Sequence, residues 1–394
     1  MRRRRHRQAA AIDVNASELL VVAGEASGDR TAAAVLDMLA GVRAFGLGGP
    51  ALAEAGAELV SDMREWTALG LGEAAARGHG VWQAWRSLSR EVRKRRPRAA
   101  LLVGYSEFNA RLAPSLHRRG TRVLWYGAPQ VWAWRAGRTE SVRRSVDRMA
   151  VVLPFEEPLW RAAGADAHYV GHPARETVLV GRRDARQSLG MTPTASAVAI
   201  LPGSRPHEVR RLLVPMLDAY EVVRSDRASV DARVFVAPSL DAATRDWVRD
   251  TCDRPHVAAF DVDARVGVMP LLPAFDVALC ASGTVSLEAA LARAVPVVAY
   301  RVGLATELAA RALLRSEHVA LPNVLLGRRA FTELLQRDVR VDRLAGALAD
   351  ALDRRKELVA DCDEVEARLG DARRPSAAVA AMLAPWLGAR ARAA

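Results

Sequence analysis

Residues 19–29 of the sequence are LLVVAGEASGD, an apolar run of five residues that ends at a glycine and is followed by small and acidic residues. A short run without polar interruption is typical of a strand buried inside a parallel sheet. The chain continues with a helical pattern from about residue 30 to residue 39. This unit predicts an α/β fold whose ligands bind beyond the carboxyl ends of the strands.

The same unit recurs in two series along the chain. Apolar runs lie at 99–103, 122–126 and 149–153, and a second series lies at 197–201, 234–237, 277–280 and 297–300, with helical patterns at 208–223 and 284–292. A linker near residue 175 separates the series. We therefore expect two Rossmann-like, doubly wound domains that face a cleft, residues 17–175 and residues 176–394. Helices expected within 341–384 either complete the second domain or cross back to the first.

The composition favours anionic partners. The 394 residues include 57 Lys and Arg against 45 Asp and Glu, a formal net charge of +12. Such a charge suits phosphorylated molecules, an anionic membrane face or nucleic acid, but no zinc-finger or RNA-binding motif is present, so nucleic acid is not an expected partner. No apolar run reaches the roughly 18 residues of a membrane span. The basic leader, residues 1–16, is a disordered tail, a mis-assigned start or an electrostatic membrane tether.

Two strand-to-helix turns in the second half predict a nucleotide diphosphate site. LPGSR at 201–205 offers backbone N–H groups and an arginine to phosphates, and SGTVSLE at 282–288 places a carboxylate one helical turn beyond Thr284, within reach of ribose hydroxyls. The alternatives are an ordinary turn with a surface arginine and a capped helix whose carboxylate favours the dipole. The expected donor-binding residues are Gly203, Ser204, Arg205, Ser282, Gly283, Thr284 and Glu288.

Two turns in the first half predict an acceptor side. The GEASGD turn at 24–29 lacks the GxGxxG spacing, and its carboxylates would repel a dinucleotide, so a sugar or acceptor loop fits better. The segment VWAWR at 131–135 forms either core or the wall of a sugar or acyl-chain site. The expected acceptor-side residues are Gly24, Glu25, Ser27, Gly28, Trp132, Trp134 and Arg135.

A basic amphipathic pattern covers residues 81–98, VWQAWRSLSREVRKRRPR. Trp82 and Trp85 lie on its apolar edge among arginines, a pattern that suits a membrane interface. The alternative is a helix that faces the core and exposes a solvated basic face.

Taken together, these motifs resemble the lipid-A-disaccharide synthase family. GEASGD, FGLGGP at 45–50, VWAWR, LPF at 153–155, GHP at 171–173, LPGSR, SGTVSLE and LPN at 321–323 keep the family's order and spacing from about residue 18 to residue 340. The resemblance implies a GT-B fold and an inverting, metal-independent transfer that needs no cofactor. It implies UDP-2,3-diacylglucosamine as donor, 2,3-diacylglucosamine 1-phosphate as acceptor, and the β-1,6-linked disaccharide 1-phosphate and UDP as products.

The resemblance also implies residue roles and a location. Arg205 and Glu288 would hold UDP, with Asn323 and Gln336 near it. The protein would be cytoplasmic and peripheral on the anionic inner membrane surface. Whether it forms a homo-oligomer is left open by the sequence.

One position departs from the family pattern. Gly104 stands where the family's suspected catalytic aspartate is expected, and an inverting transfer needs a proton acceptor. We expect Glu107 or Asp29 to serve as base, with Glu107 slightly favoured. The alternatives are a relative that acts on another UDP-sugar and a UDP-sugar-binding homologue with altered or lost catalysis, in which Glu107 only caps a helix.

Overall fold

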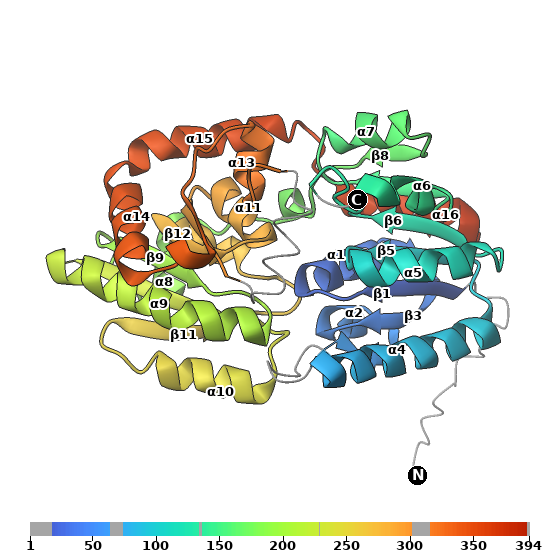
Figure 1. The fold of residues 1–394 in the computed structure, drawn as a ribbon, viewed down its shortest axis with the longest axis horizontal. Coiled ribbons are helices and arrows are strands. Elements are labelled where there is room, and N and C mark those ends of the chain that lie inside the picture. Colours follow the sequence, from blue (N-terminus) through green and yellow to red (C-terminus); the bar gives the residue numbers. More distant parts are fainter. Residues whose placement is uncertain (1–17, 64–73, 134–135, 228, 302–315, 392–394) are drawn as a thin grey trace, which may run out of the picture.

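Two parallel β-sheets organise the chain in the computed structural model, which describes residues 18–63, 74–133, 136–227, 229–301 and 316–391 (Figure 1). The first sheet has the order β4-β3-β1-β5-β6-β7-β8, with β1 Glu18–Ala23, β3 Arg43–Gly48, β4 Glu58–Asp62, β5 Ala99–Val103, β6 Arg122–Tyr126, β7 Arg148–Val151 and β8 Ala167–Tyr169. The second has the order β11-β10-β9-β12-β13-β14, with β9 Ser196–Leu201, β10 Val230–Val236, β11 Val257–Asp261, β12 Val277–Ala281, β13 Val295–Tyr300 and β14 Glu333–Leu335. The predicted fold class, two doubly wound parallel α/β units, is confirmed.

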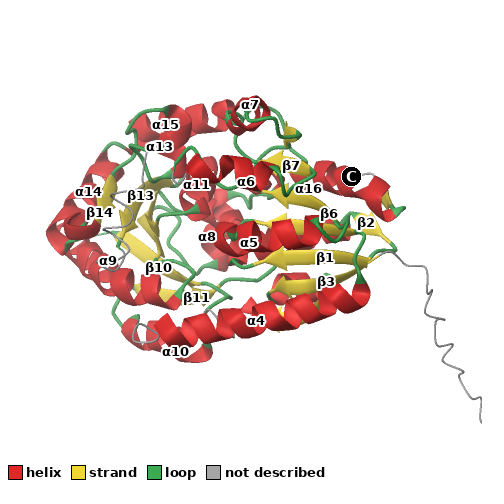
Figure 2. Cartoon of the chain, turned by 45° about the vertical axis from the view of Figure 1, so that its right-hand side comes forward, coloured by secondary structure: helices red, strands yellow, loops and turns green. Residues whose placement is uncertain are grey.

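Helices cover both sheets (Figure 2). Around the first sheet lie α1 Ala26–Asp37, α2 Pro50–Glu54, α4 Ala74–Arg95, α5 Ser106–His117, α6 Thr139–Arg143 and α7 Glu156–Ala162. Around the second lie α8 Arg182–Ser188, α9 Pro206–Asp226, α10 Ala242–Thr251, α11 Thr284–Leu291, α13 Leu321–Leu326, α14 Val341–Asp353 and α15 Arg355–Arg368. Short 3₁₀ segments are η1 Ala136–Arg138, η2 Pro173–Glu176, η3 Met269–Ala274 and η4 Gln336–Asp338. Within the described ranges, none of these helices combines the length and apolarity that a membrane crossing requires.

The expected strands at 99–103 and 122–126 coincide with β5 and β6. The helix after the first strand, however, begins at Ala26 rather than near residue 30. Glu25 has an extended backbone, φ −141° and ψ 150°, and is the N-cap residue. The last four residues of the expected GEASGD loop, 26–29, therefore form the first turn of α1, which decides where their side chains point.

The chain passes between the two lobes twice. It leaves the first lobe at 171–175 and returns after α15, so that α16 (Pro375–Leu387), the last helix, lies in the first lobe (Figure 1). Leu383 of α16 is buried in the same cluster as Leu19 and Val21 of β1. The two passages touch at Gly171, whose φ is +97° and where a Cβ would lie 2.5 Å from the Ala372 carbonyl oxygen. Glycine is required there both by the backbone angle and by the close approach.

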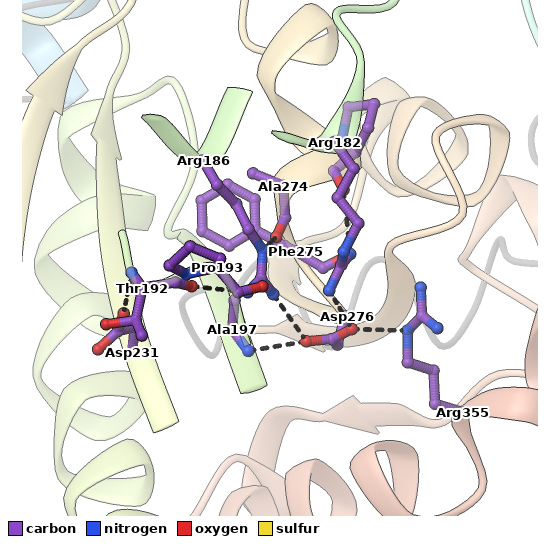
Figure 3. Close-up of polar contacts among 11 residues, drawn as sticks. Arg182, Arg186, Thr192, Pro193, Ala197, Asp231, Ala274, Phe275, Asp276 and Arg355 are labelled. Atoms are coloured by element: carbon purple, nitrogen blue, oxygen red, sulfur yellow. Dashed lines mark hydrogen bonds and ion pairs between the residues drawn. The ribbon is translucent and has the colours of Figure 1, made fainter. Parts of the chain in front are cut away.

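A buried carboxylate fastens the linker helix α8 to the second lobe (Figure 3). Asp276, next to β12, accepts hydrogen bonds from the Ala197 backbone N–H at 2.9 Å and from Arg182 Nη2 at 2.7 Å. It also pairs with Arg186 Nη2 at 3.4 Å and with Arg355 Nε at 2.9 Å. Three guanidinium groups from α8 and α15 thus share one carboxylate, which joins the linker, the sheet and the C-terminal helices.

Removal of this carboxylate should destabilise the second lobe. We expect Asp276→Ala to lower the free energy of unfolding by about 3–5 kcal/mol, because it leaves the buried guanidinium group of Arg186 without its counter-charge. Thermal unfolding monitored by circular dichroism measures the loss. The matched control is Asp353→Ala, which removes the exposed ion pair with Arg227 and should leave the free energy of unfolding nearly unchanged. Equal losses in the two variants would contradict the role of Asp276.

Candidate active site

The carboxyl ends of both sheets open into one cleft of about 780 Å³. Residues that follow β1, β5 and β6 form one wall, and residues that follow β9 and β12 form the other. This is the place where doubly wound sheets bind ligands, and the volume is in the range of small-molecule sites.

All seven donor-binding residues predicted between residues 203 and 288 line this cleft. Arg205 ends the turn after β9, and its guanidinium donates to Glu208 Oε1 through Nη1 and to Glu25 Oε1 through Nη2, both at 2.9 Å. The negative charge of Glu25, followed by that of Glu208, raises the pKa of Arg205. A cation therefore lies at the N-terminus of α9. An anionic ligand is favoured there both by the guanidinium charge and by the backbone N–H groups of the helix N-terminus.

Glu288 lies on the same wall, on α11. Its carboxylate is nearly buried and accepts a hydrogen bond from Arg30 Nη2 at 2.8 Å. Ser282 donates to the Val319 carbonyl oxygen at 3.1 Å, which fixes the turn that precedes α11. The two turns predicted as one site from the sequence thus lie on one surface.

The structure does not bring Asn323 and Gln336 to the cleft wall. Asn323 is fully buried, donates to the Phe331 carbonyl at 2.9 Å and to Glu333 Oε1 at 2.8 Å, and accepts from the backbone N–H groups of Ala330 and Phe331. Both ends of its amide are used within the segment that joins α13 to β14. Gln336 begins η4, beyond that segment.

On the opposite wall, Glu25, Ser27 and Gly28 line the cleft, whereas Gly24 does not. Gly24 lies beneath the ring of Tyr105, where a Cβ would come within 2.4 Å of the ring carbons. Trp132 also lies outside the lining and packs edge-on against Phe155, with 5.1 Å between ring centroids. Trp134 and Arg135 lie outside the described residues.

Neither carboxylate expected to serve as base points into the cleft. Asp29 is buried and accepts hydrogen bonds from the backbone N–H groups of Gly49 at 2.7 Å, Ala51 at 2.9 Å and Leu52 at 3.3 Å, so it caps α2. Burial raises the pKa of Asp29 despite these three donors. Glu107, in the first turn of α5, pairs with Arg138 Nη1 at 2.7 Å on the side facing η1.

Tyr105 is a cleft residue that sequence analysis missed. It follows Gly104, and both have left-handed backbones, with φ of +42° and +52°. Its ring stacks on Phe108, with centroids 5.3 Å apart, and lines the cleft. Burial, helped by the charge of Glu25, raises the pKa of Tyr105 to about 12, so the phenol is neutral and can donate a hydrogen bond. A bulky residue at the end of a buried strand was the signal available in the sequence.

Comparisons with known proteins agree with this geometry. The family model described as lipid-A-disaccharide synthetase matches residues 19–383. A lipid-A-disaccharide synthase from Anaeromyxobacter sp. strain K is 40% identical over 368 residues, which cover 90% of this chain and 94% of that protein. The chain belongs to the lipid-A-disaccharide synthase family. It is therefore a glycosyltransferase, and a homologue that has lost catalysis is not favoured.

Solved structures show the same fold at low sequence identity. MurG from Acinetobacter baumannii has a TM-score of 0.53 at 15% identity, covering 94% of this chain and 99% of that one. A UDP-GlcNAc 2-epimerase from Neisseria meningitidis, solved bound to UDP-GlcNAc, has a TM-score of 0.64 at 9% identity, covering 94% and 99% of the two chains. The GT-B fold of this family member is thus confirmed.

Glu156 is a second cleft residue that sequence analysis missed. It is 1% exposed and accepts hydrogen bonds from Trp132 Nε1 at 3.0 Å and from the backbone N–H groups of Leu153 at 3.1 Å and Val152 at 3.3 Å. Burial outweighs these donors and raises its pKa to about 7.

Among the described residues, no three His, Cys, Asp or Glu side chains come together as metal ligands.

The raised pKa of Glu156 should make stability depend on pH. The folded state binds the proton more tightly than the unfolded state, so the stabilising contribution is complete below the ordinary pKa of about 4.5 and is lost as the pH rises through 7. The loss amounts to roughly 1.4 kcal/mol per unit of displacement. Thermal unfolding of the parent and of Glu156→Gln between pH 4.5 and 8 tests this. The difference between their melting temperatures should change across this window; a constant difference would contradict the assignment.

Proposed function

We propose that the protein transfers 2,3-diacylglucosamine from UDP to 2,3-diacylglucosamine 1-phosphate and forms the β-1,6-linked lipid A disaccharide 1-phosphate. The observation that supports this proposal is the cleft between the lobes. On one of its walls, a cation (Arg205) and a carboxylate (Glu288) follow the ends of β9 and β12. Membership of the lipid-A-disaccharide synthase family supplies the substrate class. Incubation of the pure protein with both substrates in detergent, followed by mass spectrometry of the lipid and assay of UDP, tests the proposal.

In this proposal Arg205 and the N-terminus of α9 bind the diphosphate, because a guanidinium can donate two parallel hydrogen bonds to phosphate oxygens. Glu288 binds the ribose: one of its oxygens accepts from Arg30, and carboxylate oxygens also accept from hydroxyl groups. The SGT turn at 282–284 adds backbone N–H groups at the start of α11.

The donor site predicts two loss-of-binding variants. Arg205→Ala should weaken UDP binding by roughly 1.5–3 kcal/mol, the scale of a charge-assisted hydrogen bond, and Glu288→Ala should also weaken it. Isothermal titration calorimetry measures both. Arg249→Ala, which removes an exposed ion pair with Asp261, should leave UDP affinity unchanged. Parent-like affinity in both cleft variants would reject the donor site.

We also propose that the protein acts in the cytoplasm, peripherally on an anionic membrane surface, through the exposed face of α4 around Trp82. Trp82 is 49% exposed, with the Arg86 guanidinium 4.5 Å from its ring centroid. Trp85, the other tryptophan expected at the membrane, instead meets Phe108 edge-on at 5.3 Å and packs against the first-lobe core. The proposed lipid contact is therefore restricted to Trp82 and the basic side chains around it.

Vesicle flotation tests the membrane proposal. Trp82→Ala should reduce co-flotation with anionic vesicles several-fold, because an interfacial indole contributes apolar area and the arginines contribute charge attraction. Trp247→Ala is a matched control, since that tryptophan also lies under an arginine, Arg210, at 4.7 Å, but in the other lobe. Equal flotation of all three proteins would remove Trp82 from the proposed contact.

A further inference from the structure

We propose that Glu25 is the general base of the transfer, and that the donor's diphosphate releases it by taking over Arg205. The inference rests on the proposed function, since it assigns the proton acceptor of that reaction. It starts from a survey of the carboxylates in the cleft wall, which are Glu25, Glu156, Glu176, Glu208 and Glu288.

The other two carboxylates of the first-lobe wall are engaged by the protein itself. Glu156 has both oxygens occupied by Trp132 and two backbone N–H groups and is nearly inaccessible. Glu176 accepts from the backbone N–H of Ser376 at 2.7 Å and from its hydroxyl at 2.6 Å, one oxygen each. These contacts tie η2 to α16, so both groups stabilise the lobe.

Of the second-lobe carboxylates, Glu208 and Glu288 belong to the donor wall. Glu208 pairs with Arg205, and its Oε2 is so close to the Gly203 backbone that a Cβ there would lie 2.8 Å away. Glu288 pairs with Arg30 and is only 9% exposed. Both lie on second-lobe helices, where the diphosphate and ribose are proposed to bind, and both are already paired with an arginine.

Glu25 differs from these four in position and exposure. It follows β1 after one residue, Gly24. Its side chain is 42% exposed, and it pairs with Arg205 through an Oε1–Nη2 contact of 2.9 Å. The phenol of Tyr105 is close enough for the charges of both Glu25 and Arg205 to act on its pKa. A carboxylate that reaches across from the acceptor side thus already touches the cation proposed to bind the leaving group.

Arg205 donates one N–H of Nη1 to Glu208 and one N–H of Nη2 to Glu25. The pair with Glu25 is exposed on both sides and contributes little stability, whereas a phosphate can accept two parallel hydrogen bonds from one guanidinium. In this proposal the diphosphate binds the guanidinium on the side that Glu25 occupies, because Glu25 is more exposed than Glu208. Donor binding then frees the Glu25 carboxylate on the acceptor side of the cleft.

The reaction step balances with the groups named. The acceptor's hydroxyl oxygen attacks the anomeric carbon, and its proton passes to Glu25, which becomes a carboxylic acid. The bond between that carbon and the β-phosphate oxygen breaks, and UDP leaves with the electron pair. Arg205 stays on the diphosphate and stabilises the charge that develops there.

The experiment compares Glu25→Gln with the parent in three measurements: disaccharide turnover, UDP affinity by calorimetry, and melting temperature. We expect kcat to fall by about 10²–10⁴-fold, with UDP affinity unchanged or higher because a competitor for Arg205 is gone. In Glu25→Ala, added formate should restore part of the turnover. Glu140→Gln, a surface glutamate paired with Arg143 and Arg144, is the control and should match the parent.

Each contrary outcome has its own meaning. Turnover of Glu25→Gln within tenfold of the parent would overturn the inference, and Glu107→Gln and Glu156→Gln tested in parallel would show whether the base lies there. A tenfold loss of UDP affinity in Glu25→Gln would also overturn it, because Glu25 would then be a donor contact. A parent that binds UDP yet forms no disaccharide would instead contradict the proposed function.

Discussion

Two ion pairs of opposite polarity cross the cleft, and the chemistry of the site depends on them. Arg205 of the second lobe meets Glu25 of the first, and Arg30 of the first meets Glu288 of the second. Both first-lobe partners come from one turn of chain around the start of α1. The Arg205–Glu25 pair is exposed on both sides and contributes little stability, so it can exchange for ligand groups at small cost, whereas the Arg30–Glu288 pair is largely buried. Each pair balances a charge of one wall with a charge of the other. The same charged groups can bind a substrate when a pair opens.

Contacts outside these two pairs also hold the lobes together. The chain passes between the lobes twice, and the passages touch where Gly171 meets the Ala372 carbonyl. Tyr169 donates through its hydroxyl to the Leu369 carbonyl, and Arg175 pairs with Glu366. These contacts lie at one end of the cleft, on the side of α15 and α16. Away from these passages, Arg265 of the second lobe pairs with Asp37 and donates to the Ala51 carbonyl of the first lobe, so the lobes are joined there as well.

The sequence predicts the sheets, and the convergence of the turns at 201–205 and 282–288 on one cleft wall, because both depend on chain order alone. Buried strands and the turns after them meet at one edge wherever a sheet is doubly wound. Side-chain direction is a different matter. The early start of α1 turns Asp29 into the lobe to cap α2, and the first turn of α5 directs Glu107 toward Arg138. Asn323, which the family resemblance places near UDP, is buried and hydrogen-bonds to its own loop. Such outcomes depend on contacts between distant segments, such as residues 29 and 49.

The departure at Gly104 has a physical consequence that reaches the neighbouring strand. The left-handed backbone at Gly104 continues into Tyr105, a conformation that costs a residue with a Cβ about 1–2 kcal/mol. Stacking on Phe108 and close packing over Gly24 hold the ring in place. The ring thereby covers the start of the β1 turn and lies beside Glu25. Where the family resemblance implies a carboxylate after β5, this chain has Gly104 followed by the neutral phenol of Tyr105, and the accessible carboxylate of this wall, Glu25, follows β1. The proton-accepting role moves by one strand within the same sheet edge, without any change in the fold that supports it.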